Sequence, residues 1–232
     1  MIKYVFLDLD DTILDFHRAE AVALKRTLSH MGIAPTDATA ARYSEINDAQ
    51  WKLLEKGVLT RAEVKLRRFQ LLFEELGVEV DAEAARRYYE EQLGVGHYFL
   101  PGAEALLQAL HGRYRLFIMS NGTTAVQKGR IESAGIAPLF EAIFLSEQIG
   151  FVKPQREFFD TCFATIDGFD PREAILFGDS LSSDIQGGRN AGILTCWFNP
   201  HGKAQDPAIR PDFEVSTLDA FPHLLEQLSS RG

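Results

Sequence analysis

Five short apolar runs rich in β-branched and aromatic residues recur along this chain, and helical patterns separate most of them. The runs lie at residues 2–7, 115–120, 142–146, 174–179 and 193–198. Because parallel strands need crossover connections that are usually helices, this alternation predicts a parallel sheet that helices cover on both faces. We therefore expect an α/β fold with a Rossmann-like, doubly wound parallel sheet as its core.

The segment between the first two apolar runs breaks this alternation. From residue 17 to residue 96 only helical periodicity is present, in four stretches whose ends fall near Gly32, Gly57, Gly77 and Gly94. Thr60 and Glu63 form a capping-box pattern at the start of the third stretch. Four helices inserted after one strand predict a separate all-α cap domain. We assign residues 17–96 to this cap and residues 1–16 and 97–232 to the α/β catalytic core.

Composition and charge narrow the classes of partner. The 232 residues are 46% hydrophobic, which is enough for a sizeable core. Asp and Glu outnumber Lys and Arg by 33 to 24, and the net charge of −9 argues against binding to a nucleic acid polymer or an anionic membrane. The first apolar run is too short for a signal peptide and no later run approaches a membrane span, so we expect a cytoplasmic protein. We expect it to be a monomer or a homodimer.

Acidic residues follow two of the predicted strands at the point where each strand ends. Asp8 and Asp10 come after the first run, two residues apart, so that both side chains can point into one pocket. Asp179 ends the fourth run, and Asp184 lies in the loop or first helical turn after it. The carboxyl edge of a parallel sheet is where such folds bind ligands, and clustered carboxylates suit Mg²⁺. We expect these four aspartates to form a magnesium site.

Two further motifs suit an anion beside this metal. Ser120, Asn121 and Gly122 lie between a strand and a helical pattern, where a hydroxyl and backbone N–H groups can bind phosphate oxygens. Lys153 precedes Pro154, which favours extended backbone at the lysine. Its ammonium group can offset the charge of clustered carboxylates and of a phosphate group. Each motif taken alone is common in turns and on surfaces.

The order of the motifs DLDDT, SNG, KP and GDSLSSD resembles that of the haloacid dehalogenase superfamily of phosphohydrolases, and the helical insertion resembles its α-helical cap. The resemblance implies that Asp8 is the nucleophile and Asp10 the general acid and base. It also implies that phosphate is bound by the side chains of Thr12, Ser120, Asn121 and Lys153. Mg²⁺ would be held by Asp8, the Asp10 carbonyl and Asp179, with Asp184 supporting it.

The reaction implied by this resemblance is hydrolysis of a phosphomonoester through an aspartyl-phosphate. The dehalogenases that named the superfamily lack an aspartate at the position of Asp10 and need no Mg²⁺, so a phosphoryl reaction is favoured here. A phospho-accepting signalling domain also gathers aspartates, Mg²⁺ and a lysine at strand ends, but it would hold the phosphoryl group. The large cap and Asp10 favour turnover.

The cap pattern resembles that of pyrimidine 5′-nucleotidases of the YjjG/YfnB type, through Asn47, Trp51, Gly57 and the pair Arg68 and Phe69. This resemblance implies that the small phosphorylated substrate is a nucleoside 5′-monophosphate, and that Asn47, Trp51 and Arg68 recognise it.

Other substrates remain open at this point. N-acylneuraminate 9-phosphatases, which act on a sugar phosphate, look nearly as similar, and sugar phosphomutases share the core. Phosphonate-cleaving relatives place a Schiff-base lysine in the cap, where this chain has Lys52 and Lys56.

Overall fold

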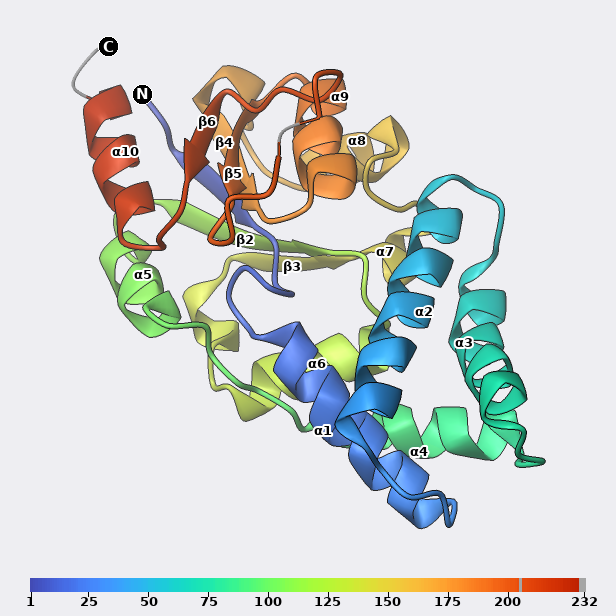
Figure 1. The fold of residues 1–232 in the computed structure, drawn as a ribbon. Helices are drawn as coiled ribbons and strands as arrows, with labels where there is room; N and C mark the ends of the chain where they lie inside the picture. Colours follow the sequence, from blue (N-terminus) through green and yellow to red (C-terminus); the bar gives the residue numbers. More distant parts are fainter. Residues whose placement is uncertain (205, 230–232) are drawn as a thin grey trace. The chain divides into compact units, whose positions relative to one another are not determined.

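The computed structural model of the protein describes residues 1–204 and 206–229 (Figure 1). The chain divides into two compact units. One comprises Met1–Asp15, Phe99–Thr124 and Ala134–Gly232, and it holds the sheet. The other comprises Phe16–Tyr98 and Ala125–Ser133, and its elements are helices. Within the described residues, every helix is too short or too polar to cross a membrane.

The first unit is built on a six-stranded sheet in which all neighbouring strands are parallel. The strand order is β3-β2-β1-β4-β5-β6. The chain moves toward one edge from β1 to β3 and then crosses to the other side at β4, so the order reverses between β1 and β4. This confirms the predicted doubly wound sheet. The strands are β1 (Tyr4–Leu7), β2 (Arg115–Ser120), β3 (Ala142–Leu145), β4 (Ala174–Gly178), β5 (Leu194–Phe198) and β6 (Phe213–Val215).

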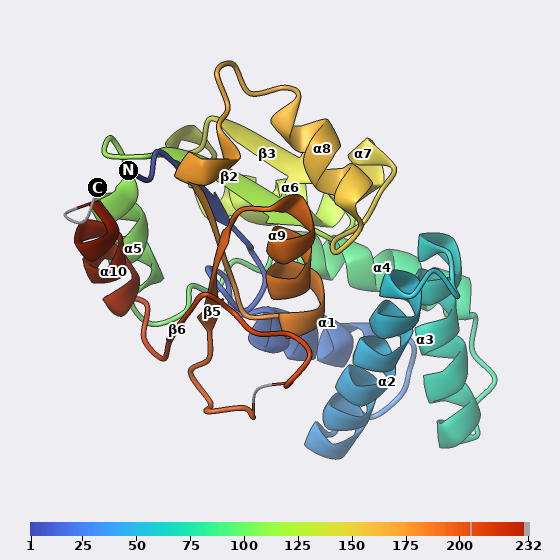
Figure 2. The ribbon, with the colours of Figure 1, turned by 90° about the horizontal axis from the view of Figure 1, so that it is seen from above.

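Helices cover both faces of this sheet because its strands are apolar on both sides. Phe6 of β1 points to one face, where its ring lies 5.4 Å from that of Phe163. Phe177 of β4 points to the opposite face and stacks on Phe221 at 4.1 Å. Figures 1 and 2 show α5 beside α10 on the Phe221 side, and α8 beside α9 on the other. The helices of this unit are α5 (Ala103–Leu110), α7 (Ser146–Ile149), α8 (Arg156–Phe163), α9 (Gln186–Ala191) and α10 (Ala220–Ser229).

The second unit contains the four helices predicted for the cap. The predicted capping box is present at Thr60, whose hydroxyl accepts from the backbone of Glu63 while the Glu63 carboxylate accepts from the Thr60 amide. The interior is apolar and includes a group of aromatic rings, in which the ring of Tyr43 lies 5.2 Å from Phe69 and 5.5 Å from Tyr89. The helices are α1 (Phe16–His30), α2 (Asp37–Glu55), α3 (Arg61–Leu76) and α4 (Ala82–Gly94).

One more helix, α6 (Thr124–Ser133), groups with this unit over residues 125–133. Gly129 lies so close to Gly94 of α4 that a Cβ atom at position 129 would meet the Gly94 carbonyl oxygen at 2.6 Å. The buried Arg130 guanidinium also donates to the Gly96 carbonyl at 2.9 Å. The division at residues 17–96 proposed from sequence leaves α6 in the core. The structure packs it with the helices because a glycine pair admits this close approach.

Candidate active site

Predicted site residues lie at the carboxyl ends of three neighbouring strands, at one edge of the sheet. Asp8 follows β1, Ser120 ends β2, and Asp179 follows β4. β1 pairs with both β2 and β4, and the Asp8 amide continues the pairing by donating to the Phe177 carbonyl at 2.9 Å. The carboxyl ends of these strands therefore meet where the strand order reverses, which is where ligands bind in open α/β sheets.

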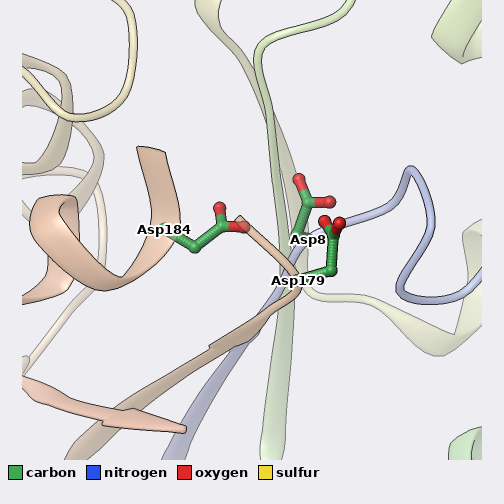
Figure 3. A group of neighbouring side chains, drawn as sticks. All are labelled: Asp8, Asp179 and Asp184. Atoms are coloured by element: carbon green, nitrogen blue, oxygen red, sulfur yellow. The ribbon is translucent and has the colours of Figure 1, made fainter. Parts of the chain in front are cut away.

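Three of the four predicted metal ligands come together here. Asp8, Asp179 and Asp184 each offer a carboxylate oxygen, and these oxygens lie within 4.8 Å of one another. Figure 3 shows the three side chains converging from β1, from the end of β4 and from the turn after it. Asp8 and Asp184 are buried, and Asp179 is half-buried. Asp10 is half-buried, and its carboxylate is not part of this group.

A buried lysine binds two of these carboxylates. The Lys153 ammonium donates to Asp8 Oδ1 at 2.7 Å and to Asp184 Oδ1 at 2.6 Å. Its third donor contact is the Met119 carbonyl at 2.7 Å, so all three N–H bonds have acceptors. Lys153 is 1% exposed, which places the ion pairs in a region of weak solvent screening. The predicted role of Lys153 beside the aspartates thus has a direct geometric basis.

The charges at this edge are strongly coupled. Burial raises the pKa of Asp8 to about 8; Lys153 opposes this rise, and Asp184 and Asp10 add to it. Burial and the neighbouring charges of Asp8 and Asp184 also raise the pKa of Asp179 well above its usual range. Burial alone would lower the pKa of Lys153, but Asp184 and Asp8 hold it above its ordinary value. One ammonium group leaves the three carboxylates with excess negative charge.

This excess fits a divalent cation. Oxygen donors are the ligands that Mg²⁺ takes in proteins, and three carboxylates within mutual reach supply them. A cation here would offset the repulsion that raises the carboxyl pKa values. The residues present therefore suit the predicted metal.

The position of Asp184 depends on a missing side chain at Gly178. A Cβ atom at position 178 would meet the Asp184 Oδ2 atom at 2.3 Å. The Ser180 amide donates to the same oxygen at 3.0 Å. The turn after β4 is the single π-helical turn η3 (Leu181–Ile185), and the Ser180 hydroxyl caps it by accepting from the Ser183 amide. Close backbone approach and these two contacts fix the Asp184 carboxylate against the strand end.

The predicted phosphate-binding residues Thr12, Ser120 and Asn121 differ in their contacts. Asn121 and Lys153 form a reciprocal pair, in which the Asn121 amide group donates to the Lys153 carbonyl and accepts from the Lys153 amide, both at 2.9 Å. The Ser120 hydroxyl accepts from the Gly122 amide at 3.0 Å. The buried Thr12 hydroxyl has no hydrogen-bond partner within the described residues. Asn121 thus orients the lysine segment, and Thr12 keeps unused hydrogen-bonding capacity.

A tight turn directly follows Asp10. Asp11 has a positive φ of 54°, and its amide donates to the Leu14 carbonyl at 2.8 Å. Aspartate tolerates this left-handed conformation better than most residues. The chain therefore turns back directly after Asp10, so that Asp10 lies beside the end of β1 and does not continue the strand.

Sequence reasoning missed one residue of this site. The Trp197 indole N–H donates to the Asp179 carbonyl at 2.8 Å, and Trp197 is 1% exposed. Trp197 is also paired with Gly178 in the register of β4 and β5. The apolar run at 193–198 predicts a buried strand, but strand alternation gives no sign that an indole N–H reaches the neighbouring strand end.

The residues predicted to read the substrate belong to the helical unit. Asn47 and Arg68 are buried and bonded to each other, and Trp51 is half-buried. Lys52 and Lys56 are exposed. A Schiff-base lysine is normally desolvated so that its amine is neutral, so their exposure does not favour the phosphonate-cleaving alternative.

Comparison with known proteins gives consistent matches over nearly the whole chain. The model of the haloacid dehalogenase-like hydrolase family matches residues 2–192. HAD-hydrolase YfnB of Bacillus subtilis is 39% identical over 223 residues, covering 96% of this chain and 95% of its own. Pyrimidine 5′-nucleotidase PynA of Streptococcus pneumoniae is 39% identical, covering 92% and 90%, and pyrimidine 5′-nucleotidase YjjG of Escherichia coli is 31% identical, covering 97% and 96%.

A solved structure shares the fold of the whole chain. The crystal structure of YfnB bound to magnesium has a TM-score of 0.92 at 38% identity and covers 97% of this chain and 98% of that one. Together with the sequence matches, it confirms the family resemblance inferred from the four motifs and the helical cap.

Proposed function

Because this chain belongs to the haloacid dehalogenase-like hydrolase family, we propose that it is a Mg²⁺-dependent phosphatase that hydrolyses nucleoside 5′-monophosphates. The observation that carries the phosphatase chemistry is the bridge from Lys153 to Asp8 and Asp184, with Asp179 completing the acidic cluster. In this proposal, Asp8 is the carboxylate nucleophile, and the adjacent Lys153 ammonium offsets part of the charge of the phosphate dianion.

In the proposed first half-reaction, a carboxylate oxygen of Asp8 attacks the phosphorus atom in line with the leaving group. A bond forms between Asp8 and phosphorus while the bond from phosphorus to the ester oxygen breaks. Asp10, in its acid form, gives its proton to that oxygen, so the alcohol leaves neutral. The product is an aspartyl-phosphate on Asp8.

In the second half-reaction, the Asp10 carboxylate takes a proton from water as the water oxygen attacks the same phosphorus. The bond between Asp8 and phosphorus breaks, and inorganic phosphate leaves with Asp8 and Asp10 restored. Lys153 keeps its charge throughout and stabilises negative charge on the phosphoryl oxygens, as do the hydroxyls of Ser120 and Thr12.

Mg²⁺ would be held by Asp8, Asp179 and the Asp10 carbonyl, with Asp184 supporting the site. When bound, it supplies Lewis-acid neutralisation of the phosphoryl oxygens.

The nucleotide substrate is supported by two relatives that are named pyrimidine 5′-nucleotidases and that align with more than nine-tenths of this chain. A half-buried indole at Trp51 suits such a substrate because an aromatic ring can stack on a base.

Release of inorganic phosphate from a substrate panel tests this function. The panel contains pyrimidine and purine nucleoside 5′-monophosphates, sugar phosphates, a phosphonate and p-nitrophenyl phosphate, each with Mg²⁺ or with excess chelator. We expect the highest kcat/KM for pyrimidine nucleotides with Mg²⁺, and background rates for Asp8→Asn. Full activity in chelator would contradict the metal requirement, and a preference for a sugar phosphate would replace the substrate assignment.

A further inference from the structure

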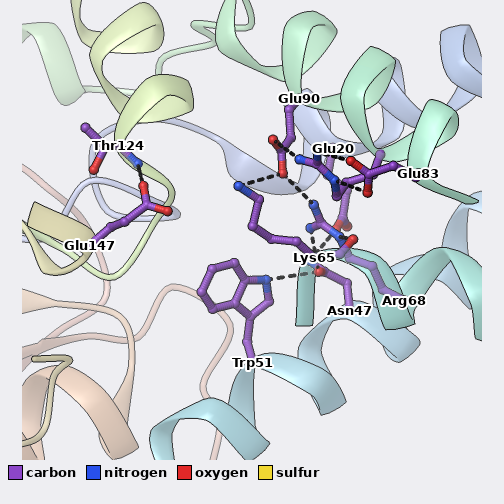
Figure 4. Close-up of polar contacts among 10 residues, drawn as sticks. Glu20, Asn47, Trp51, Lys65, Arg68, Glu83, Glu90, Thr124 and Glu147 are labelled. Carbon is purple, nitrogen blue, oxygen red and sulfur yellow. Dashed lines mark hydrogen bonds and ion pairs between the residues drawn. The ribbon is translucent and has the colours of Figure 1, made fainter. Parts of the chain in front are cut away.

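Each of the four helices α1 to α4 contributes at least one polar side chain to a connected group inside the helical unit (Figure 4). Asn47 Nδ2 of α2 donates to Glu20 Oε1 of α1 at 2.7 Å, and Arg68 Nη1 of α3 donates to Asn47 Oδ1 at 2.9 Å. Glu90 of α4 lies 4.0 Å from the Arg68 guanidinium and 3.1 Å from the Lys65 ammonium. Polar groups are thus paired between helices that otherwise pack through aromatic side chains.

The Asn47 amide has one favourable orientation in this group. Its oxygen accepts from Arg68 and also from the Trp51 indole N–H at 3.0 Å, while its nitrogen donates to the Glu20 carboxylate. Reversing the amide would set an NH₂ group against two donors and an oxygen against a carboxylate. Because Asn47, Arg68 and Glu20 are buried, a broken pairing would leave a polar group without a partner and without water. The acceptor for the Trp51 indole is therefore fixed in position before any ligand arrives.

The Arg68 side chain is buried inside the helical unit. It is 4% exposed, and its guanidinium carbon lies 4.8 Å from the centre of the Tyr89 ring and 5.9 Å from that of Tyr43. A guanidinium that is enclosed by rings and bonded to Asn47 is poorly placed to contact a substrate.

Trp51 differs from Arg68 in its exposure. It is half-buried, and Figure 4 shows its indole N–H directed at Asn47 while the six-membered ring extends away from the network. The Arg61 guanidinium carbon lies 5.5 Å from the centre of the Trp51 ring, so a planar group already lies over this ring.

We propose that Trp51 is the specificity-determining residue that stacks on the base of the substrate, and that Asn47 and Arg68 are positioning residues that act through its indole. This inference rests on the proposed nucleotidase function for its substrate. The sequence pattern groups these three residues together, but their geometry gives them different roles. Trp51 contacts the substrate, whereas Asn47 and Arg68 hold the Trp51 side chain in place. An aromatic ring that is oriented before binding loses less conformational freedom when a base stacks on it, so freeing the ring to reorient weakens binding.

The positioning role is tested without substrate by NMR of protein labelled with ¹⁵N-tryptophan. The chain has two tryptophans, so two indole N–H signals are expected, and Trp51→Phe assigns them. In Asn47→Leu and Arg68→Met, the Trp51 signal should shift or broaden while the Trp197 signal stays in place. Arg67, the exposed neighbour of Arg68 on α3, supplies the matched control Arg67→Met, which should leave both signals unchanged. An unchanged Trp51 signal in both buried variants would overturn the positioning role.

The specificity role is tested by a double-mutant cycle of Trp51→Phe and Arg68→Met with uridine monophosphate and with methyl phosphate, a small ester that has no ring to stack on Trp51. Each single variant should raise KM for the nucleotide about tenfold and lower kcat/KM for the small ester by a clearly smaller factor. In the Trp51→Phe background, Arg68→Met should have no further effect on the nucleotide. Arg68→Lys should recover part of the loss because it keeps the buried charge.

Two kinetic outcomes would overturn the proposal. Additive effects would mean that Arg68 contacts the substrate itself, and equal losses with both substrates would mean a purely structural role. If the wild-type enzyme hydrolyses no nucleotide, the proposed function fails, while the NMR experiment still decides whether Asn47 and Arg68 position Trp51.

Discussion

The buried carboxylate of Glu20 gives a quantitative test of the network in the helical unit. Glu20 is 2% exposed, and burial raises its pKa from an ordinary 4.5 to about 7, although Ser44 and the Arg68 charge act in the opposite direction. The folded protein therefore holds a proton that the unfolded chain releases between pH 4.5 and pH 7. Stability from this group is fully present below about pH 4.5 and is lost as the pH rises through 7, by ~3 kcal/mol in total.

Replacing Glu20 with Gln removes this titration while keeping a side-chain oxygen for Asn47. We expect the free energy of unfolding of Glu20→Gln, relative to wild type, to increase by ~3 kcal/mol between pH 4.5 and pH 8. Urea denaturation at pH 5, 6, 7 and 8, followed by circular dichroism and tryptophan fluorescence, measures this difference. Glu91→Gln, at an exposed position of α4, is the control. A difference between Glu20→Gln and wild type that stays constant across this range would refute the effect of burial on Glu20.

Three further substitutions test the geometry of the sheet edge. Gly178→Ala introduces a Cβ atom 2.3 Å from an Asp184 oxygen, so we expect weaker Mg²⁺ binding by calorimetry and a loss of kcat/KM of about 10²-fold or more. Trp197→Phe removes the hydrogen bond to the Asp179 carbonyl and should raise the Kd for Mg²⁺ about two- to tenfold, with an unchanged Kd contradicting a positioning role. Lys153→Met removes the cation that lowers the pKa of Asp8, so the acid limb of the profile of kcat/KM against pH should move to higher pH; an unmoved limb would contradict that role.

The sheet and most helices follow from sequence patterns because their signals are local. Alternating apolar runs and helical stretches predict five of the six strands and that they are parallel, and the capping box at Thr60 is visible as two residues three positions apart. The edge strand β6 has three residues and none of them is fully buried, so its pattern is too short to recognise. The approach of Gly129 to Gly94 joins segments 35 positions apart, and no periodicity in either segment indicates it.

The candidate site was predictable to the extent that topology alone brings residues together. Strand ends in a parallel sheet share one edge, so the meeting of Asp8, Asp179 and Asp184 follows from their positions in the sequence. The internal partners of side chains do not follow in this way. Two examples are the hydrogen bond from the Trp197 indole to the Asp179 carbonyl and the hydrogen bond from the buried Arg68 to Asn47. Both depend on how strands and helices pack, which sequence spacing does not encode.

The central claim is that Asp8 carries the phosphoryl group and that Asp10 serves both half-reactions. In Asp10→Asn, turnover should fall by ~10²–10⁴-fold because proton transfer is lost, while Asp8 can still attack. With p-nitrophenyl phosphate, whose leaving group needs little protonation, this variant should be phosphorylated and then stall.

Acid quenching of Asp10→Asn after one addition of p-nitrophenyl phosphate, followed by peptide mass spectrometry, measures this directly. We predict a burst of at most one nitrophenolate per site and one phosphoryl group on the peptide that contains Asp8, at residue Asp8. A label on Asp10, on a serine or on a histidine, or appreciable turnover by Asp8→Asn, would contradict the account.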